Sequence, residues 1–290
     1  MSRRKGIILA GGSGTRLFPI TLGISKQLLP VYDKPMIYYP LSVLMLTSIR
    51  DIAIITNPLD VASFQRMLGD GSQWGIRINY IEQPSPDGLA QSFILAEDFL
   101  DGSPSALILG DNIFHGAQLS ELLSLADKNV HGAKVFGYQV SDPERYGVLN
   151  FDQKGKITDI IEKPEKPQSN YAVTGLYFVD ATASEKAKSV EPSSRGELEI
   201  VTLLKMYLDA DELEVSKMGR GFAWFDTGTH DSLLDASNYI CTLERRQGFK
   251  IACLEEIAYS LGWIGRADLE KRAQLMSKNE YGRYLQKLIF

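Results

Sequence analysis

The most informative stretch of the chain is Gly6–Pro40, which reads GIILAGGSGTRLFPITLGISKQLLPVYDKPMIYYP. Its apolar run Ile7–Ala10 leads directly into Gly11-Gly12-Ser13-Gly14. Short apolar runs bounded by glycine are typical of buried parallel strands, and open α/β sheets bind ligands beyond the carboxyl ends of such strands. Glycine lets backbone N–H groups approach an anion because no Cβ lies in the way. The stretch therefore predicts a strand followed by a phosphate-binding loop.

Two familiar phosphate-binding templates do not fit this loop. A dinucleotide-binding fingerprint needs a third glycine where Leu17 stands, and a Walker loop needs Gly-Lys-Ser/Thr where the chain has Gly14-Thr15-Arg16. Arg16 is therefore expected to be the main charge at the loop. The glycines alone also leave open a plain turn between a strand and a helix.

Strands and helices are predicted to alternate from the first strand onward. The apolar runs are short, rich in β-branched residues or leucine, and bounded by Gly, Asp or Pro, while the intervals have helix-like spacing. Alternation of this kind predicts a right-handed, doubly wound sheet. The expected strands are Ile7–Ala10, Ile52–Thr56, Ile76–Glu82 and Ala106–Leu109, and the expected helices are Leu41–Ile49, Val61–Leu68 and Leu89–Leu100.

The pattern changes after Ala133, where several strands follow one another with few helices between them. Asp152, Lys154 and Gly155 indicate a hairpin turn between two of these strands. After Asp231 the apolar residues recur only at helical spacing. The expected strands are Ala133–Val140, Gly147–Phe151, Ile157–Glu162 and Ala172–Val179, followed by a helix at Glu197–Leu208.

The whole pattern predicts an α/β, Rossmann-like fold. A mixed, mostly parallel central sheet would be flanked by helices, with a small antiparallel extension and C-terminal helices. We expect one α/β domain over residues 1–230 and a helical C-terminal extension over residues 231–290 that packs on it.

Composition excludes several classes of protein. The chain has 290 residues, 44% of them hydrophobic, and a net charge of −5 with no long run of one sign, which argues against nucleic-acid or membrane-surface partners. A basic pocket for a phosphorylated ligand stays compatible with that charge. Cys241 and Cys253 lack metal-binding spacing and are expected to be reduced thiols. No apolar run is long enough for a signal peptide core or a membrane span, so we expect a cytoplasmic protein.

Two aspartates follow apolar runs in the way that metal ligands do in this kind of sheet. Asp111 comes directly after Leu107-Ile108-Leu109-Gly110, and Asp226 lies in Ala223-Trp224-Phe225-Asp226. Mg²⁺ prefers one or two carboxylates together with water and substrate phosphates. By residue type alone, either aspartate could instead form a turn or cap a helix.

Other polar residues are candidates for contacts with a base or a sugar phosphate. Gln83 precedes a stiff loop that ends in Asp87-Gly88, and a glutamine amide can both donate to and accept from the edge of a pyrimidine. Lys163 could bind a phosphate and Glu162 could accept hydrogen bonds from sugar hydroxyls. Without further context, Gln83 could equally be an ordinary loop amide, and a Glu-Lys pair is usually solvated surface. The three histidines lack metal-binding spacing and are expected to be structural: His115, His131 and His230.

One extended motif is far more specific than any of these features. Gly11-Gly12-x-Gly14-Thr15-Arg16-Leu17-x-Pro19-x-Thr21 is followed by Lys26, Leu29-Pro30-Val31 and Lys34-Pro35-Met36 with Tyr38. This pattern resembles the signature of the sugar-1-phosphate nucleotidylyltransferases, and Ser25–Pro40 looks most like the thymidylyl branch of that family. The resemblance covers essentially the whole chain, including C-terminal helices typical of the short bacterial form.

The resemblance implies a reaction and a set of site residues. The expected reaction is Mg²⁺-dependent, joins dTTP to α-D-glucose 1-phosphate and gives dTDP-glucose and pyrophosphate, as the first step toward dTDP-L-rhamnose and related deoxysugars. By resemblance, the catalytic residues are Arg16, Lys26 and Lys163, and the metal ligands are Asp111 and Asp226. The nucleotide-binding residues are Leu9, Gly11, Gly12, Ser13, Gly14, Thr15, Gln27, Gln83, Pro86, Gly88 and Asp111. The sugar-phosphate-binding residues are Asn112, Tyr146, Gly147, Glu162, Lys163 and Val173.

The resemblance also implies a homotetramer and a second, regulatory site for a feedback inhibitor such as dTDP-rhamnose. Its expected residues are Gly116, Lys250, Ile251, Ala252, Cys253 and Glu256.

Three rival interpretations remain. A uridylyl or cytidylyl transferase would differ only in the shape of its base pocket. A non-catalytic regulatory homologue should have lost charged site residues, whereas all five are present: Arg16, Lys26, Asp111, Lys163 and Asp226. A Rossmann dehydrogenase is disfavoured by Leu17 in the fingerprint.

Overall fold

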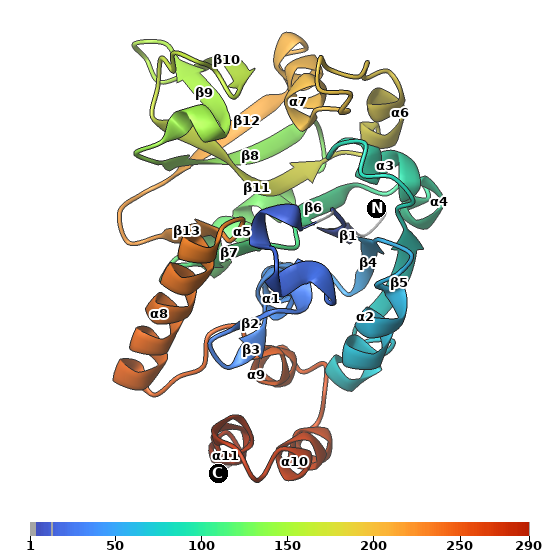
Figure 1. Cartoon of the computed structure of the whole chain (residues 1–290), viewed down its shortest axis with the longest axis vertical. Coiled ribbons are helices and arrows are strands. Elements are labelled where there is room, and N and C mark those ends of the chain that lie inside the picture. Colours follow the sequence, from blue (N-terminus) through green and yellow to red (C-terminus); the bar gives the residue numbers. More distant parts are fainter. Residues whose placement is uncertain (1–3, 13, 290) are drawn as a thin grey trace.

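The computed structural model describes residues 4–12 and 14–289, and its centre is a mixed sheet (Figure 1). Among the described residues this sheet has nine strands, with the order β10-β9-β11-β6-β1-β4-β5 and with β8 and β12 joined through β11. Its strands are β1 (Lys5–Ala10), β4 (Asp51–Thr56), β5 (Arg77–Glu82), β6 (Ser105–Leu109), β8 (Ala133–Gln139), β9 (Gly147–Phe151), β10 (Ile157–Glu162), β11 (Tyr171–Val179) and β12 (Leu213–Met218).

The direction of the strands confirms the expected fold class. Strand β1 pairs parallel with β4 and β6, and β4 pairs parallel with β5. Strand β11 runs antiparallel to β6, β8 and β9, and β10 runs antiparallel to β9. Since β12 is parallel to β8, only β10 and β11 oppose the other seven described strands. The sheet is therefore mixed and mostly parallel.

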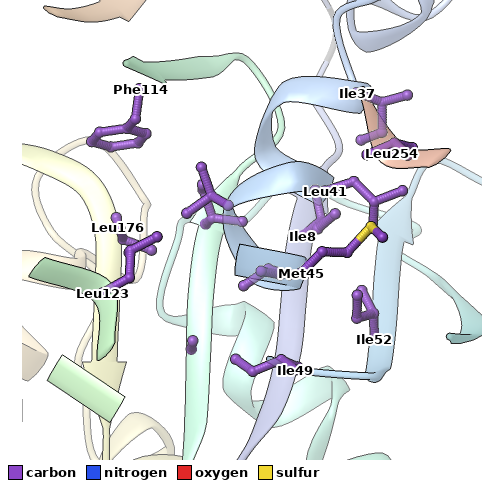
Figure 2. Close-up of a cluster of buried hydrophobic side chains, with 14 of the residues drawn as sticks. Ile8, Ile37, Leu41, Met45, Ile49, Ile52, Phe114, Leu123, Leu176 and Leu254 are labelled. Atoms are coloured by element: carbon purple, nitrogen blue, oxygen red, sulfur yellow. The ribbon is translucent and has the colours of Figure 1, made fainter. Parts of the chain in front are cut away.

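Strand β1 is apolar on both faces because each face meets its own core. Ile8 packs with Ile52 on one face, and Ile7 packs with Ile55 on the other. Figure 2 shows the first of these cores, where Ile8 and Ile52 of the sheet face side chains of helix α1 (Tyr38–Leu46). Burial on both sides explains why the strand sequence is continuously apolar rather than alternating.

The remaining helices cover the sheet and extend beyond it. Helix α2 has the expected bounds, whereas the single helix expected at Leu89–Leu100 is two short helices separated at Ala96. The helix expected from Glu197 begins only at Ile200. The helices are α2 (Val61–Leu68), α3 (Gln91–Leu95), α4 (Glu97–Leu100), α5 (Leu119–Lys128), α6 (Ala183–Lys188) and α7 (Ile200–Asp209).

Two small sheets and several short turns were not predicted. One small sheet pairs β7 (Asn112–His115) with β13 (Ala223–Asp226), and the other pairs β2 (Pro30–Val31) with β3 (Lys34–Pro35). These strands are too short for periodicity to identify them. The 3₁₀ turns are η1 (Thr15–Leu17), η2 (Ile20–Leu22), η3 (Lys26–Leu28), η4 (Ser72–Trp74) and η5 (Pro143–Arg145).

From Thr229 onward the described chain is helical, as the sequence predicts. The Thr229 side chain caps the first of these helices by accepting from the Ser232 N–H at 3.2 Å, and Gly248 ends that helix with a left-handed φ of 76°. The helices are α8 (His230–Gln247), α9 (Leu254–Ser260), α10 (Arg266–Leu275) and α11 (Glu280–Lys287). Helix α8 lies against β2 and β13, α9 packs on α1, and α10 packs on α11 (Figure 1). No helix among residues 4–12 and 14–289 is long and apolar enough to cross a membrane.

Candidate active site

A cleft of about 310 Å³ lies beyond the carboxyl ends of β1 and β6 and is closed on its other side by β9, β10 and β11. This is the edge of the sheet where the sequence predicts a ligand site. Thirteen of the expected site residues line the cleft: Leu9, Gly11, Arg16, Lys26, Gln27, Asp111, Asn112, Tyr146, Gly147, Glu162, Lys163, Val173 and Asp226.

A second hollow of about 280 Å³ adjoins this cleft and shares Gly11, Arg16 and Lys26 with it. Its lining adds four more of the expected residues: Gly12, Gly14, Thr15 and Pro86. The glycine-rich loop therefore forms a wall between two connected spaces. Ser13, also expected in the site, lies outside the described residues.

Glycine is required at three positions of the loop, for two different physical reasons. Gly12 and Gly14 have φ angles of 99° and 61°, in the region that favours glycine. Gly11 has no room for a side chain, because a Cβ there would lie 1.9 Å from Oε1 of Gln83. The Thr21 hydroxyl donates to the Gly14 carbonyl at 2.7 Å and ties the loop to the turn that follows.

Lys26 and Asp111 form an ion pair at the floor of the cleft. The Asn112 amide also donates to Asp111 Oδ1 at 3.0 Å. Burial tends to raise the pKa of the Asp111 carboxyl, but the charge and the hydrogen bond of Lys26, with help from Asn112, lower it below its usual value. Asp111 is thus held as an anion.

The small β7–β13 sheet brings the second aspartate to the same place. Asp226 pairs with Asn112 in this sheet, and the Thr227 hydroxyl donates to the Asp111 carbonyl at 2.8 Å. Burial and the nearby charge of Asp111 raise the pKa of Asp226 to about 6, although Lys26 and Arg16 oppose the shift. The carboxylates of Asp111 and Asp226 therefore repel each other and both line the same cleft.

Arg16 lies beside this pair. A Cβ placed on Gly228 would lie 3.5 Å from a guanidinium nitrogen of Arg16 and 3.3 Å from Asp226 Oδ1. Among the described residues no three His, Cys, Asp or Glu side chains form a metal-binding group. Asp111 and Asp226 offer two carboxylates to one space, and two carboxylates could hold a divalent cation that also takes phosphate and water oxygens.

The rest of the cleft lining offers neutral polar groups as well as charge. Asn112 is 1% exposed, and its Oδ1 accepts hydrogen bonds from Trp224 Nε1 at 2.7 Å and from the Gly175 N–H at 3.1 Å. Lys163 Nζ lies 3.7 Å from Glu162 Oε1. A Cβ on Gly147 would lie 3.0 Å from Val201 and 3.4 Å from Glu162 Oε2, so glycine keeps that part of the cleft open.

Two expected base-contacting residues do not line either space. Gln83 is 4% exposed and its Nε2 donates to Gln91 Oε1 at 2.7 Å. Gly88 lies against the backbone of Leu198, whose carbonyl oxygen would be 2.4 Å from a Cβ at that position. Gln83 therefore lies against Gly11 of the glycine-rich loop and Gly88 against Leu198, and neither lines the cleft.

Sequence reasoning missed several residues that line the cleft, among them Arg145, Tyr177, Arg195 and Glu199. Arg195 forms ion pairs with Glu162 at 3.0 Å and with Glu199 at 2.8 Å. The i, i+4 spacing of Arg195 and Glu199 is the only local signal, and it is common on protein surfaces. Glu199 directly precedes α7, which packs on β10, and the ion pairs of Arg195 with Glu199 and with Glu162 of β10 hold Arg195 beside them.

The residues expected to form a regulatory site have varied surroundings. Gly116 contacts Phe222, whose ring would lie 2.5 Å from a Cβ at position 116. Lys250 pairs with Asp33 and with Glu244, the latter at 2.7 Å. Glu256 accepts a hydrogen bond from Tyr284 at 2.7 Å. Ile251 and Ala252 pack beside α8, and Cys253 packs with the C-terminal helices.

Comparison with known proteins gives a consistent result. Residues 5–242 match the family model described as nucleotidyl transferase. A glucose-1-phosphate thymidylyltransferase of Xanthomonas campestris is 62% identical over 98% of this chain and 97% of its own length. One of Mycobacterium tuberculosis is 51% identical over 98% of this chain and 99% of its own length.

Solved structures agree with the sequence relatives. A Bacillus anthracis protein described as a glucose-1-phosphate thymidylyltransferase, in complex with sucrose, is 42% identical with a TM-score of 0.75 and covers 81% of this chain and 94% of its own. A UDP-glucose pyrophosphorylase complexed with UDP-glucose is 25% identical with a TM-score of 0.73 and covers 83% of this chain and 99% of its own.

Proposed function

Because this chain belongs to the nucleotidyl transferase family, we propose that it transfers a thymidylyl group from dTTP to α-D-glucose 1-phosphate, which gives dTDP-glucose and pyrophosphate. Relatives with this name are similar to the chain over nearly its full length. The observation that carries the proposal is the meeting of the glycine-rich loop, Arg16, Lys26 and the Asp111–Asp226 pair in one cleft.

The first part of the mechanism concerns the nucleophile. A phosphate oxygen of the sugar 1-phosphate is already anionic at neutral pH, so no general base is required. The oxygen attacks the α-phosphorus of the nucleotide in line, and the bond from that phosphorus to the pyrophosphate oxygen breaks. Positioning and stabilisation of charge then supply the catalysis.

The cationic side chains divide this work by position. Arg16 and the loop N–H groups hold the pyrophosphate as it leaves, because they border the hollow that adjoins the cleft. Lys26 neutralises charge near the α- and β-phosphates from the floor of the cleft. Lys163, which also lines the cleft, orients the attacking phosphate.

Asp111 and Asp226 would hold Mg²⁺. The pKa of Asp226 is raised in part because the anionic Asp111 repels its charge. A divalent cation bound between the two carboxylates would relieve this repulsion. When bound there, the metal would neutralise charge on the nucleotide phosphates.

The same geometry supports the proposed substrate contacts. Glu162, Asn112 and the open space at Gly147 suit sugar hydroxyls, and Tyr146 and Val173 complete that wall. On the nucleotide side Leu9, Gln27 and Pro86 border the two connected spaces. Gln83 and Gly88 are proposed to contact the base, which requires a change from their present positions outside both spaces.

A second candidate is transfer of a uridylyl or cytidylyl group. The similarity to a UDP-glucose pyrophosphorylase at a TM-score of 0.73 favours keeping it in the test. A non-catalytic regulatory homologue is disfavoured, since Arg16, Lys26, Lys163 and both aspartates all line the cleft.

One assay tests the proposed function. Pyrophosphate release is measured with dTTP, UTP, CTP and ATP, each combined with several sugar 1-phosphates, with and without Mg²⁺. We expect release to be fastest with dTTP and glucose 1-phosphate and to require Mg²⁺. Faster release with UTP or CTP would establish the second candidate, and no release with any pair would overturn catalysis.

Four further proposals rest on the resemblance of the sequence. They are the division of the chain at residue 230, a homotetramer, a place at the start of dTDP-L-rhamnose synthesis in the cytoplasm, and feedback by dTDP-rhamnose at the Gly116 and Lys250–Glu256 region. The start of α8 at His230 supports the division. Sedimentation analysis and inhibition assays with dTDP-rhamnose test the assembly and the feedback.

A further inference from the structure

A further hollow of about 290 Å³ adjoins the cleft, between the end of β8, the turn η5 and the start of α8. We call it the side hollow and define it by Asp142, Arg145, Tyr146, Asp226 and Asp235. Arg145, Tyr146 and Asp226 line the cleft as well. The two spaces therefore share a border, and the guanidinium of Arg145 is part of it.

Arg145 differs from three other cations of the cleft in the place of its partner. Lys26, Lys163 and Arg195 each pair with a carboxylate that itself lines the cleft. Arg145 donates from Nη1 to Asp142 Oδ2 at 2.7 Å, and Asp142 lines the side hollow but not the cleft. An anion in the cleft can therefore take Arg145 from its partner without leaving an unpaired carboxylate inside the cleft.

The ion pair of Arg145 with Asp142 is weak enough to be exchanged. It spans the turn η5, and its side chains are 42% and 38% exposed. Exposed ion pairs contribute little to stability because water screens them. The planar guanidinium of arginine can instead bind a phosphate through two parallel hydrogen bonds to charged oxygens, which are stronger. A phosphate that enters the cleft would therefore displace Asp142 from Arg145.

The position of Arg145 favours the sugar phosphate over the leaving pyrophosphate. Its guanidinium carbon lies 5.5 Å from the ring centroid of Tyr146, and that ring packs on Trp224 with centroids 5.2 Å apart. Gly147, which keeps open the part of the cleft proposed for the sugar, is two positions further along the chain. Arg145 does not line the hollow beside the glycine-rich loop, where the pyrophosphate is proposed to leave.

We propose that Arg145 binds the phosphate of glucose 1-phosphate, and that Asp142 holds its guanidinium at the border of the cleft until this phosphate enters. Asp142 is then a positioning residue that competes with the substrate for Arg145. The inference rests on the proposed function, and it gives the attacking phosphate a second cation besides Lys163.

The test compares two substitutions that should act in opposite directions in the pyrophosphate-release assay. Arg145→Ala is expected to lower kcat/KM for glucose 1-phosphate by about 30-fold and to leave the KM for dTTP unchanged, because only the sugar phosphate loses a contact. Arg145→Lys should recover part of this loss, since the charge remains but the fork is gone. Asp142→Asn is expected to lower the KM for glucose 1-phosphate by about threefold, because the competing carboxylate is removed.

A second exposed ion pair supplies matched controls. Arg266 pairs with Glu270 on α10, so Arg266→Ala and Glu270→Gln should keep the wild-type KM for both substrates. Asp142→Asn should have no effect once Arg145 is replaced by alanine. If the pair only stabilised the turn, Asp142→Asn would raise the KM for glucose 1-phosphate as Arg145→Ala does, and that result would overturn the inference. A wild-type KM and kcat in Arg145→Ala would overturn it as well.

Titration calorimetry of glucose 1-phosphate with the same variants measures the contact without turnover. Weaker binding to Arg145→Ala and tighter binding to Asp142→Asn would support the contact even if no pyrophosphate were released and the proposed function were overturned. Wild-type affinity in both variants would overturn the contact and leave the proposed function in place.

Discussion

Lys26 and Lys34 are eight positions apart in one motif, and each lies near a proline, yet the fold gives them opposite surroundings. Lys26 has a 17% exposed side chain that faces the cleft and pairs with Asp111, while Asp226 stands nearby with a raised pKa. Lys34 has a 1% exposed side chain that pairs with Asp33 and with Glu244 at 2.7 Å.

The second cluster is a closed network of ion pairs. Lys250 pairs with Asp33 and with Glu244 at 2.7 Å, and the Ile251 N–H donates to Glu244 at 2.9 Å. Every member therefore has a partner of opposite charge, and the network joins the β2–β3 turn to the end of α8. The Lys26 cluster keeps a repulsion between Asp111 and Asp226, so it can receive a cationic ligand. The Lys34 cluster is fully paired, so its role is to hold the structure together.

The largest predicted effect is on stability and comes from the closed network. Glu244→Gln leaves Lys34 buried beside a single carboxylate, and we expect the free energy of unfolding in urea to fall by about 3 kcal/mol. Glu165→Gln, at an exposed position, serves as the control and should change it little.

A double variant sharpens this prediction. Lys34→Met added to Glu244→Gln should recover most of the stability, because the uncompensated ammonium is then gone, the introduced amide can still accept from the Ile251 N–H, and Asp33 still pairs with Lys250. Equal loss in the single and double variants would contradict the view that the uncompensated charge is the cause.

Substitution of the charged residues that line the cleft should change activity rather than stability. Arg16→Ala is expected to lower kcat in the pyrophosphate-release assay by about 10²-fold or more, because a preorganised charge is lost. Since the Arg16 side chain is exposed, its unfolding midpoint should match that of the exposed control Arg246→Ala, which should keep wild-type turnover. Wild-type turnover in Arg16→Ala would remove Arg16 from the mechanism.

A smaller effect on stability is expected from the hydrogen bonds that link α11 to the carboxylates of Glu255 and Glu256 on α9. Tyr281 donates to the fully buried Glu255 at 2.7 Å, and Trp74 donates to the same carboxylate at 3.0 Å. Tyr281→Phe should lower the free energy of unfolding by about 2 kcal/mol. Tyr284→Phe is the matched comparison. Its partner Glu256 is less buried than Glu255, so the free energy of unfolding should fall by less than in Tyr281→Phe.

The smallest effect is a dependence on pH. Burial tends to raise the pKa of Asp33, but Lys34 and Lys250 lower it below its usual value. The stabilisation by Asp33 is therefore present above the unfolded pKa of about 3.9 and is lost as the pH falls through the lower folded value. Asp33→Asn should be less stable than wild type at pH 7, and the difference should shrink in thermal unfolding measured below about pH 4. A difference that is constant with pH would show that the charge of Asp33 does not matter.

The sequence predicts well those strands and helices that are long enough to show a hydrophobic periodicity. Helix α2 has its expected range, β1 ends at Ala10 as expected but begins at Lys5 rather than Ile7, and the hairpin turn at Asp152–Gly155 joins β9 to β10 as expected. The expected helix Leu89–Leu100 is broken at Ala96, where φ and ψ of −90° and 5° depart from the helix, and its composition gives no warning of this.

The candidate site divides in the same way. The glycine-rich loop and Arg16 are contiguous with β1, so local sequence places them at the end of a strand. The meeting of Asp111 with Asp226 depends on the four-residue strands β7 and β13, which are more than 100 positions apart and carry no periodic signal. Arg195 lies in the cleft beside Glu162 of β10, its ion-pair partner, which is 33 positions earlier in the chain.

By itself, the sequence determined the α/β class, the glycine-rich loop after β1 and the types of charge available to the cleft, because these depend on the local order of residues along the chain. Only the tertiary structure decided which lysine faces a ligand space and which is sealed in a network, and that the two aspartates share one space. The physical reason is that burial and charge pairing depend on contacts between distant segments, which set the local electrostatics after the chain has folded.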